Sequence, residues 1–394
     1  MTHHLRPALP LALAAAAALA IAPAAAPAKV RKGPAGDAFY TPPSKTTAKS
    51  HGAPIWARKL TGPAALKHAR SNTLVLYRST DAAGKPDAVS GTITVPKGKA
   101  PKGGWPVLTW AHGTTGIGDG CAPSRDGGSA YSSYVYPQLG QWLKAGYAVV
   151  RTDYQGLGTP GVHGYLIGTD EGRSVLDIVR AARKVVPHLS KRVIIGGHSQ
   201  GGHAALWAAA LAKSWTPELK VAGTVAFAPA SHLGEQASLI RAVTTPSALT
   251  ALAALILRGA DSADPSLNVV SLLSDKAAAL YPLTLTECLP ALAVVNGYAG
   301  MAPSEALKDG ADLGPLIAFL NANDPETLKI RTPVEILQGT ADSTVLPPFT
   351  DQLDTDLRGN GAKVTYRKYD GIDHGGIVAA ANRAALSFAH KRLR

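Results

Sequence analysis

The most informative stretch of this 394-residue sequence is IIGGHSQGGHAALWAA, residues 194–209. It begins as an apolar run typical of a buried strand, turns through Gly197-His198-Ser199-Gln200-Gly201, and continues as an alanine-rich pattern typical of a helix. G-x-S-x-G between a strand and a helix is the pattern of a nucleophile elbow, which exposes the serine hydroxyl above the sheet. The pentapeptide alone is also common as a plain glycine turn. The flanking strand and helix favour the elbow, so Ser199 is the predicted nucleophile.

Eight strand-like runs, most of them short and apolar, recur along the chain. The expected strands cover residues 73–79, 89–95, 107–110, 148–153, 192–196, 221–228, 334–339 and 364–369. Helical patterns between or after them include 170–186, 199–213, 347–358 and 375–392. Apolar strands separated by helices are typical of a mainly parallel sheet covered by helices on both faces. The sequence therefore predicts an α/β fold, with its first two strands pairing antiparallel at one edge.

The alternation of strands and helices stops after residue 231. Helix-like runs at 247–257 and 304–322 lie there among several prolines, without a convincing strand. We expect residues 232–327 to form a helical cap over the carboxyl edge of the sheet, inserted into a core made of 51–231 and 328–394. Residues 248–257 are apolar almost all round, so this helix is either buried in the packing of the cap against the core or in contact with an apolar partner.

The N-terminus has the pattern of a secretory signal peptide. Residues 1–28 contain one arginine and two histidines, then an apolar run at 11–22, and end in Ala26-Pro27-Ala28. The apolar run is shorter than the ~20 residues that a membrane-spanning helix needs. Residues 29–50, rich in Lys, Pro, Gly and Thr, are expected to be a loosely ordered lead-in. The sequence thus predicts a secreted protein whose signal peptide is cleaved.

Composition excludes some classes of function. Hydrophobic residues make up 46% of the chain and charged residues 17%, which is typical of a globular protein with a sizeable core. The net charge is +13, but the 40 Lys and Arg are scattered singly, whereas a nucleic-acid partner usually requires a basic stripe. No P-loop, dinucleotide fingerprint or metal cluster is evident in the sequence, so we expect no cofactor and no metal.

Two cysteines, Cys121 and Cys288, lie far apart in the sequence. In an exported chain they are expected to form a disulfide, and two buried free thiols are the alternative. Neither has a neighbour at the spacing of a zinc site.

A serine nucleophile needs a base and an orienting carboxylate, which in this architecture follow it in the order acid, then histidine. His374 lies in YDGIDHGG, just after the last expected strand, and is the predicted base; His232 and His390 lie in the cap and the terminal helix. Asp342 lies in a turn that ends the strand VEILQG and is the predicted acid. The other acids nearby are interpreted as turn residues, caps or exposed helical charge: Asp324, Asp351, Asp354, Asp356 and Asp373.

An oxyanion also needs N–H donors. The residue after the nucleophile, Gln200, is one predicted donor. The loop after the third expected strand carries His112-Gly113-Thr114-Thr115, and Thr114 is the favoured second donor, with Gly113 or Thr115 as alternatives. His198 and His203, close to the serine, are interpreted as packing or turn residues.

Several separated segments together resemble the secretory lipase (lipase A-like) family of α/β-hydrolases, including its exported bacterial members. The segments are HGTTGIGDGCAPS, DYQGLGTPGVHGYLIGTDEGRSVLDIVRAAR, GGHSQGGHAALWAA, QGTADSTVLP and DGIDHGG, spread over about residues 105–380. The resemblance implies an α/β-hydrolase fold with a helical cap, a Ser199–Asp342–His374 triad, a Cys121–Cys288 disulfide, and hydrolysis of carboxylic esters, including acylglycerols. Family members differ among themselves around the second oxyanion donor, and the resemblance is poorest in the cap.

The leading hypothesis is a secreted serine esterase or lipase acting on a small-molecule or lipid ester, with transient contact at a lipid surface. A peptidase or an acyltransferase would use the same site, and a binding module would keep the fold without chemistry. The sequence gives no oligomeric state and no acyl-chain preference.

Overall fold

The structure is a computed structural model that describes residues 1–3, 30–43 and 50–393. The predicted signal peptide lies almost entirely outside the described residues. Within them, no helix combines the length and the apolar character that a membrane span requires.

A nine-stranded sheet forms the centre of the molecule, in the order β1-β2-β3-β5-β4-β6-β7-β8-β9. Strands β4 to β9 run parallel to one another, while β1, β2 and β3 form an antiparallel edge, and β3 pairs antiparallel with β5. The strands are β1 Pro54–Lys59, β2 Ser71–Thr80, β3 Pro86–Val95, β4 Trp105–Ala111, β5 Ala148–Thr152, β6 Leu189–His198, β7 Lys220–Phe227, β8 Val334–Gly339 and β9 Val364–Tyr369. The predicted mainly parallel sheet with an antiparallel edge is confirmed.

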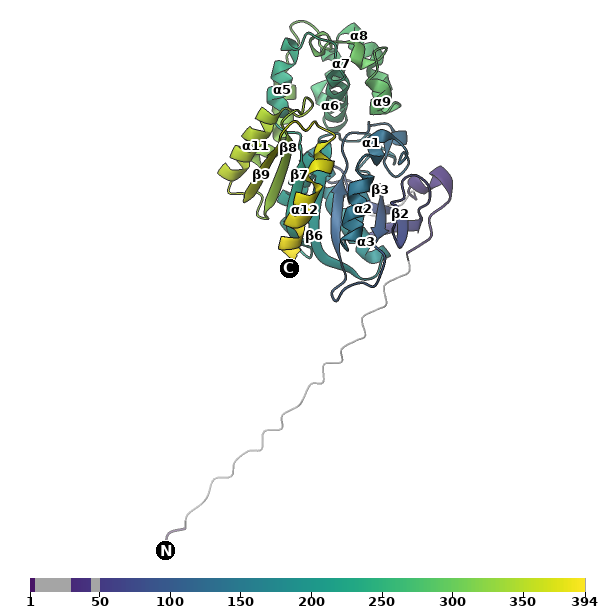
Figure 1. Ribbon diagram of the computed structural model, residues 1–394, viewed down its shortest axis with the longest axis vertical. Coiled ribbons are helices and arrows are strands. Elements are labelled where there is room, and N and C mark those ends of the chain that lie inside the picture. Colours follow the sequence, from purple (N-terminus) through teal and green to yellow (C-terminus); the bar gives the residue numbers. More distant parts are fainter. Residues whose placement is uncertain (4–29, 44–49, 394) are drawn as a thin grey trace.

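Helices cover both faces of this sheet (Figure 1). On one face, α3 (Gly168–Val185), α4 (Gln200–Trp215) and α11 (Pro347–Gly359) contribute buried side chains to one apolar cluster. On the other face, α2 (Tyr136–Lys144) and α12 (Ile377–Leu393) pack against a second cluster. Because both faces are buried, most of the parallel strands consist of nearly continuous apolar residues.

A group of helices between β7 and β8 lies over the carboxyl end of the sheet, at the top of Figure 1. Its helices have their own apolar cluster. They are α5 Leu233–Leu239, α6 Leu249–Ala263, α7 Val269–Leu272, α8 Asp275–Leu280, α9 Leu289–Leu292 and α10 Gly314–Ala322, with 3₁₀ turns η3 Ile240–Ala242, η4 Pro265–Leu267, η5 Tyr281–Leu285, η6 Tyr298–Gly300, η7 Pro303–Glu305 and η8 Pro325–Thr327. We keep residues 232–327 as the proposed extent of this cap.

The structure differs from the expected helix 304–322. That stretch divides into η7, which ends at Glu305, and α10, which begins at Gly314. Between them Leu307 forms a β-bridge with Leu273, and Gly310 adopts φ 70°, a left-handed conformation that no helix residue has.

Part of the segment expected to be a loose lead-in packs against the core. Residues Gly36–Tyr40 form the 3₁₀ helix η1, and Phe39 is fully buried. The indole N–H of Trp56 in β1 donates to the carbonyl of Phe39 at 2.9 Å. The buried side chains of Phe39 and Tyr40 thus anchor this segment, although its Lys- and Pro-rich composition suggested disorder.

Two further elements fix the loop that follows β4. These are the 3₁₀ turn η2 (Asp119–Cys121) and the single-turn helix α1 (Ala130–Ser133), in which the backbone N–H of Tyr131 donates to the side chain of Ser129 at 3.2 Å. This loop lies beside the carboxyl end of β6, where the predicted nucleophile is found.

Candidate active site

Ser199 lies between β6 and α4 in a strained backbone conformation, with φ 59° and ψ −121°. The flanking residues Gly197 and Gly201 must be glycines, because a Cβ atom at either position would clash with the backbone. A Cβ on Gly197 would lie 1.9 Å from the carbonyl oxygen of Gly201, and a Cβ on Gly201 would lie 2.0 Å from that of Ala111. The strand and the helix are therefore as close as the elbow pattern requires. Strained backbone conformations such as that of Ser199 cluster at functional sites.

Asp342 and His374 come from the loops that follow β8 and β9. The Nδ1 atom of His374 donates to Oδ2 of Asp342 at 2.7 Å. The other carboxylate oxygen of Asp342 accepts from the backbone N–H of Thr344 at 2.8 Å and of Val345 at 2.9 Å. Burial raises the pKa of Asp342, but the hydrogen bond and charge of His374 and these N–H groups outweigh it, so the pKa is lowered. The carboxylate is therefore ionised and fixes the imidazole with Nε2 available as a base.

Ser199 and His374 line one cavity of about 650 Å³. Gly113 and Thr114, from the loop after β4, line the same cavity. A second cavity of about 320 Å³, lined mainly by apolar side chains of the cap, also reaches Ser199. The predicted nucleophile, the predicted base and the segment with the predicted second oxyanion donor thus line one cavity, and Ser199 also lines the other.

Gln200 is the first residue of α4, and the N–H groups in the first turn of a helix have no partner within that helix. Its side chain is held by the carboxylate of Glu171 at 2.7 Å and by Nε2 of His163 at 2.9 Å. This anchoring fixes the position of the Gln200 N–H at the elbow. The second predicted donor, Thr114, is positioned by a hydrogen bond of 2.6 Å between its hydroxyl and that of Tyr165.

A buried polar network behind the elbow was not foreseen from the sequence. Glu171 is fully buried and accepts from Gln200, from the backbone N–H of Leu166 at 3.0 Å and from Nδ1 of His203 at 3.2 Å. Glu171 lies in the first turn of α3. Its partners lie 5 to 32 residues away in the sequence, and only the packing of α3 on α4 brings them together.

His198, interpreted from the sequence as a packing or turn residue, contacts the loop that carries the predicted base. Its Nε2 donates to the backbone carbonyl of His374 at 2.8 Å, and its ring lies 4.5 Å from the ring of His374. On the other side, its Nδ1 accepts from the hydroxyl of Tyr134 at 2.5 Å. Burial, followed by the proximity of His374, holds the pKa of His198 well below its usual range, so the ring is neutral.

Cys121 and Cys288 form a disulfide with their Cα atoms 5.4 Å apart, as predicted. The bond joins the loop after β4 to the start of α9 in the cap. Beside it, the backbone N–H of Leu289 donates to the carbonyl of Thr115 at 2.9 Å. The disulfide therefore fixes the cap to the loop that carries the predicted second oxyanion donor.

The structure does not bring the other sequence candidates to the nucleophile. Asp373 accepts the backbone N–H of Gly376 at 2.7 Å, and Asp324 caps η8. Asp351 and Asp354 pair with Lys368 and Arg358 on the surface. His390 stacks on Tyr147, while His232 and Asp356 contact each other at the edge of the cap.

Comparisons with known proteins agree with this geometry. The model of the secretory lipase family matches residues 136–394. Lipase A of Moesziomyces aphidis is 30% identical over 220 residues, which are 52% of this chain and 44% of that protein. A probable inactive lipase of Mycobacterium tuberculosis, MT1628, is 31% identical over 216 residues, which are 51% of this chain and 47% of that protein. The chain thus spans about half the length of the curated relatives it matches.

Among solved structures, Candida antarctica lipase A in its closed state matches with a TM-score of 0.75 at 21% identity, covering 90% of this chain and 85% of that chain. This match confirms the predicted α/β-hydrolase fold. The narrower resemblance to exported bacterial members stays a prediction. Since the family model covers more than half of the sequence, the chain belongs to the secretory lipase family.

Proposed function

We propose that this protein is a secreted serine hydrolase that cleaves carboxylic esters, acylglycerols among them, through an acyl-enzyme on Ser199. The observation that carries the proposal is the His374–Asp342 hydrogen bond of 2.7 Å beside a cavity that also contains the elbow serine. Membership of the secretory lipase family supports both the ester substrate and an extracellular location.

In the proposed reaction, Oγ of Ser199 attacks the ester carbonyl carbon while Nε2 of His374 takes the hydroxyl proton. The negative charge that forms on the carbonyl oxygen is stabilised by the N–H of Gln200 and an N–H of the Gly113–Thr114 segment. The ester C–O bond then breaks, and His374 returns the proton to the departing alcohol. Water, deprotonated by His374, attacks the acyl-enzyme, and the carboxylic acid is released as Ser199 regains its proton.

The lining of the smaller cavity supports a lipid ester as the substrate. Leu249, Leu252 and Ile256 of α6, together with leucines of α5 and α10, surround it. Apolar walls bind an acyl chain with roughly 0.8 kcal/mol for each CH₂ that they remove from water.

Replacing the predicted nucleophile tests the proposal. Ser199→Ala should lower turnover of p-nitrophenyl esters by about 10⁶-fold, because the serine acts together with its base as one unit. Ser214→Ala, a matched change at the exposed end of the same helix α4, should keep the parent rate. Ester turnover in Ser199→Ala close to that of the control would refute the assignment.

One relative is named a probable inactive lipase, so a non-catalytic binding module is the second candidate. A fluorophosphonate probe separates the two, because only an activated serine forms the adduct. The absence of an adduct on Ser199 in the folded parent would favour the binding module. Faster turnover of aminoacyl anilides than of esters with matched leaving groups would instead favour a peptidase.

A further inference from the structure

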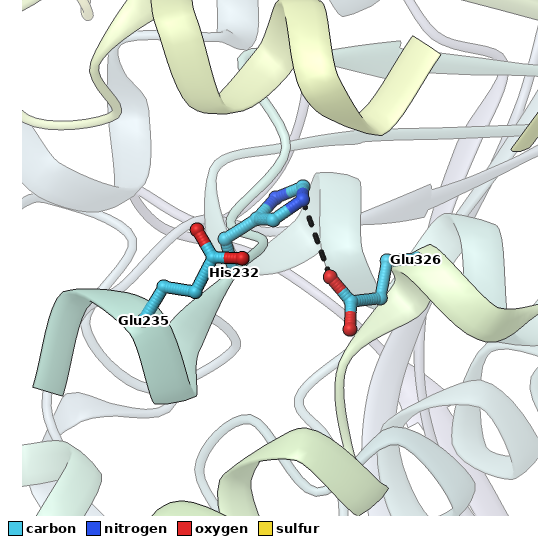
Figure 2. A group of neighbouring side chains, drawn as sticks. All are labelled: His232, Glu235 and Glu326. Atoms are coloured by element: carbon cyan, nitrogen blue, oxygen red, sulfur yellow. Dashed lines mark ion pairs between the residues drawn. The ribbon is translucent and has the colours of Figure 1, made fainter. Parts of the chain in front are cut away.

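A buried histidine at the edge of the cap faces several carboxylates. His232 follows β7 and is 2% exposed. Its Nε2 lies 3.2 Å from Oε2 of Glu326 and 3.1 Å from Oδ2 of Asp356. Glu235, one turn along α5, belongs to the same group, and the ligand atoms of His232, Glu235 and Glu326 all lie within 4.8 Å of one another. Figure 2 shows the imidazole between the two glutamates.

The imidazole is held in this orientation from the other side. Its Nδ1 contacts the hydroxyl of Ser231 at 3.2 Å, and its ring stacks on Phe349 with centroids 5.8 Å apart. The backbone of His232 adopts φ 54°, a left-handed conformation that costs energy for a residue other than glycine. These constraints aim Nε2 at the carboxylate oxygens.

The negative charge gathered around His232 contrasts with the net charge of +13 of the whole chain. Three carboxylates, those of Glu235, Glu326 and Asp356, gather around one imidazole. Among the ion pairs of residues 30–43 and 50–393, those of Glu326 and Asp356 are with His232, and Glu235 takes part in none. A bound cation would relieve this crowding of negative charge.

We propose that His232, Glu235 and Glu326 bind a divalent transition-metal ion of the Zn²⁺ class, with Asp356, whose Oδ2 lies 3.1 Å from Nε2 of His232, turning toward the ion as a fourth ligand. Zn²⁺ takes imidazole nitrogen and carboxylate oxygen at bond lengths of about 2.0–2.2 Å in a tetrahedron, whose edges are then about 3.3 Å. The distances of 3.2 and 3.1 Å from Nε2 to the two carboxylate oxygens match such edges. Ca²⁺ and Mg²⁺ prefer oxygen ligands alone, so a site built around a buried imidazole discriminates against them.

The ligands come from three segments that meet where the cap joins the core. His232 lies where the chain enters the cap, Glu326 lies in η8 where the chain leaves it, and Asp356 lies on the core helix α11. The backbone N–H of Leu233 already donates to the carboxylate of Asp324 at 2.6 Å, which links entry and exit. A metal ion would fasten both connections of the cap to α11. This site is distinct from the Ser199 cavities and does not depend on the proposed ester hydrolysis.

Calorimetric titration of the chain with ZnCl₂ tests the proposal, using protein made without a histidine tag and first dialysed against EDTA. We expect one Zn²⁺ per chain with micromolar or tighter affinity and a higher thermal midpoint of unfolding, because a ligand that binds only the folded state stabilises it. CaCl₂ at the same concentration should leave the midpoint unchanged. Glu326→Gln and Asp356→Asn, which keep side-chain size, should each weaken Zn²⁺ binding at least tenfold.

Asp354→Asn is the matched control, since it makes the same change on α11 at a carboxylate that pairs with Arg358 instead. It should bind Zn²⁺ as the parent does. The proposal is overturned if the parent binds no Zn²⁺ at these concentrations, or if folded Glu326→Gln and Asp356→Asn both bind it with unchanged affinity. If either variant fails to fold, the comparison of Zn²⁺ with Ca²⁺ in the parent decides: an equal rise in midpoint with both ions refutes a site built on imidazole.

Discussion

His374 is held at two points, its ring nitrogen and its backbone carbonyl. Asp342 binds its ring nitrogen, and His198 binds its backbone carbonyl. His198 in turn depends on Tyr134, whose hydroxyl donates to Nδ1. A side chain next to the nucleophile thus positions the loop of the predicted base, without contacting the reacting atoms itself.

We predict that Tyr134→Phe lowers kcat for ester hydrolysis by about tenfold with little change in KM. The change leaves a buried nitrogen of His198 without its donor, which costs about 1–3 kcal/mol, and 1.4 kcal/mol corresponds to a factor of ten in rate. Steady-state kinetics across pH measures the effect, and a shifted pH profile would distinguish lost positioning of His374 from general damage. Tyr136→Phe is the control, because the Tyr136 hydroxyl is buried without a partner among the described residues. Equal kinetics in both variants would contradict the positioning role.

The residues of the proposed triad could be predicted because each is marked by a local sequence pattern. The G-x-S-x-G pentapeptide around Ser199 indicates the elbow. Asp342 and His374 each lie in a turn directly after a predicted strand, which places both at the carboxyl edge of the sheet. The bond from His198 to His374 spans 176 residues, and the one to Tyr134 spans 64, so no local pattern contains them. Of the three carboxylates grouped with His232, Glu326 and Asp356 are likewise distant in the sequence, and Glu235 alone lies close to it.

The helix α6 has two apolar sides with different surroundings. Leu252 lines both cavities, whereas Leu255 is fully buried in the apolar cluster of the cap. The two roles proposed for this helix therefore fall to different faces: Leu255 packs the cap, and Leu252 lines the cavities that we propose to hold the acyl chain. A substitution at Leu252 addresses the cavity, and one at Leu255 would disturb folding of the cap.

Leu252→Asp is expected to change the preference for acyl length. A carboxylate in the cavity wall would be desolvated by a long acyl chain, so kcat/KM for a twelve-carbon p-nitrophenyl ester should fall at least tenfold relative to the acetyl ester. Val295→Asp, at a cap residue that is 79% exposed and lines neither cavity, should keep the parent profile. If Leu252→Asp kept the parent ratio between long and short esters, α6 would not line the acyl site.

Strands and helices with a clear apolar run or a strong helical periodicity could be predicted from the sequence, and elements that lack such a pattern were missed. Strands β8 and β9 match their predicted bounds residue for residue. Strand β1, with the sequence PIWARK, was missed because an edge strand with Arg58 and Lys59 lacks a clear apolar alternation. Helix α2 was missed as well, since Pro137 and Gly140 interrupt the residues that favour a helix.

For the molecule as a whole, one buried acid makes stability depend on pH. Asp170 at the start of α3 is 4% exposed, and its Oδ1 has no protein partner among the described residues. Burial, followed by repulsion from Asp81, raises the pKa of Asp170 to about 8, and Arg173 opposes the shift. The folded state therefore keeps this proton over a pH range in which the unfolded chain has lost it.

The sign of the effect follows from that difference. At pH values below the ordinary Asp pKa of about 3.9, Asp170 is protonated in both the folded and the unfolded state, so it gives the free energy of unfolding no pH dependence. Between there and pH 8, where only the folded state keeps the proton, the free energy of unfolding falls as pH rises. Asp170→Asn removes this titration and should gain at least about 1 kcal/mol over the parent between pH 4 and pH 8, since one pKa unit corresponds to about 1.4 kcal/mol. Urea unfolding of both proteins at the two pH values measures it. Parallel pH dependence of parent and variant would show that Asp170 does not carry the effect.

The Cys121–Cys288 bond closes a covalent ring of the chain with a sequence separation of 167 residues, and Ser199 lies inside it. The link between α5 and α6 is also inside the ring and contains exposed polar residues such as Thr244 and Thr245, the kind of site that proteases nick. A single cut there leaves both pieces joined through sulfur, with the elbow and the cap still attached to the same molecule. In surroundings rich in proteases but poor in reductants, a nicked chain would therefore keep its parts together rather than shed its cap.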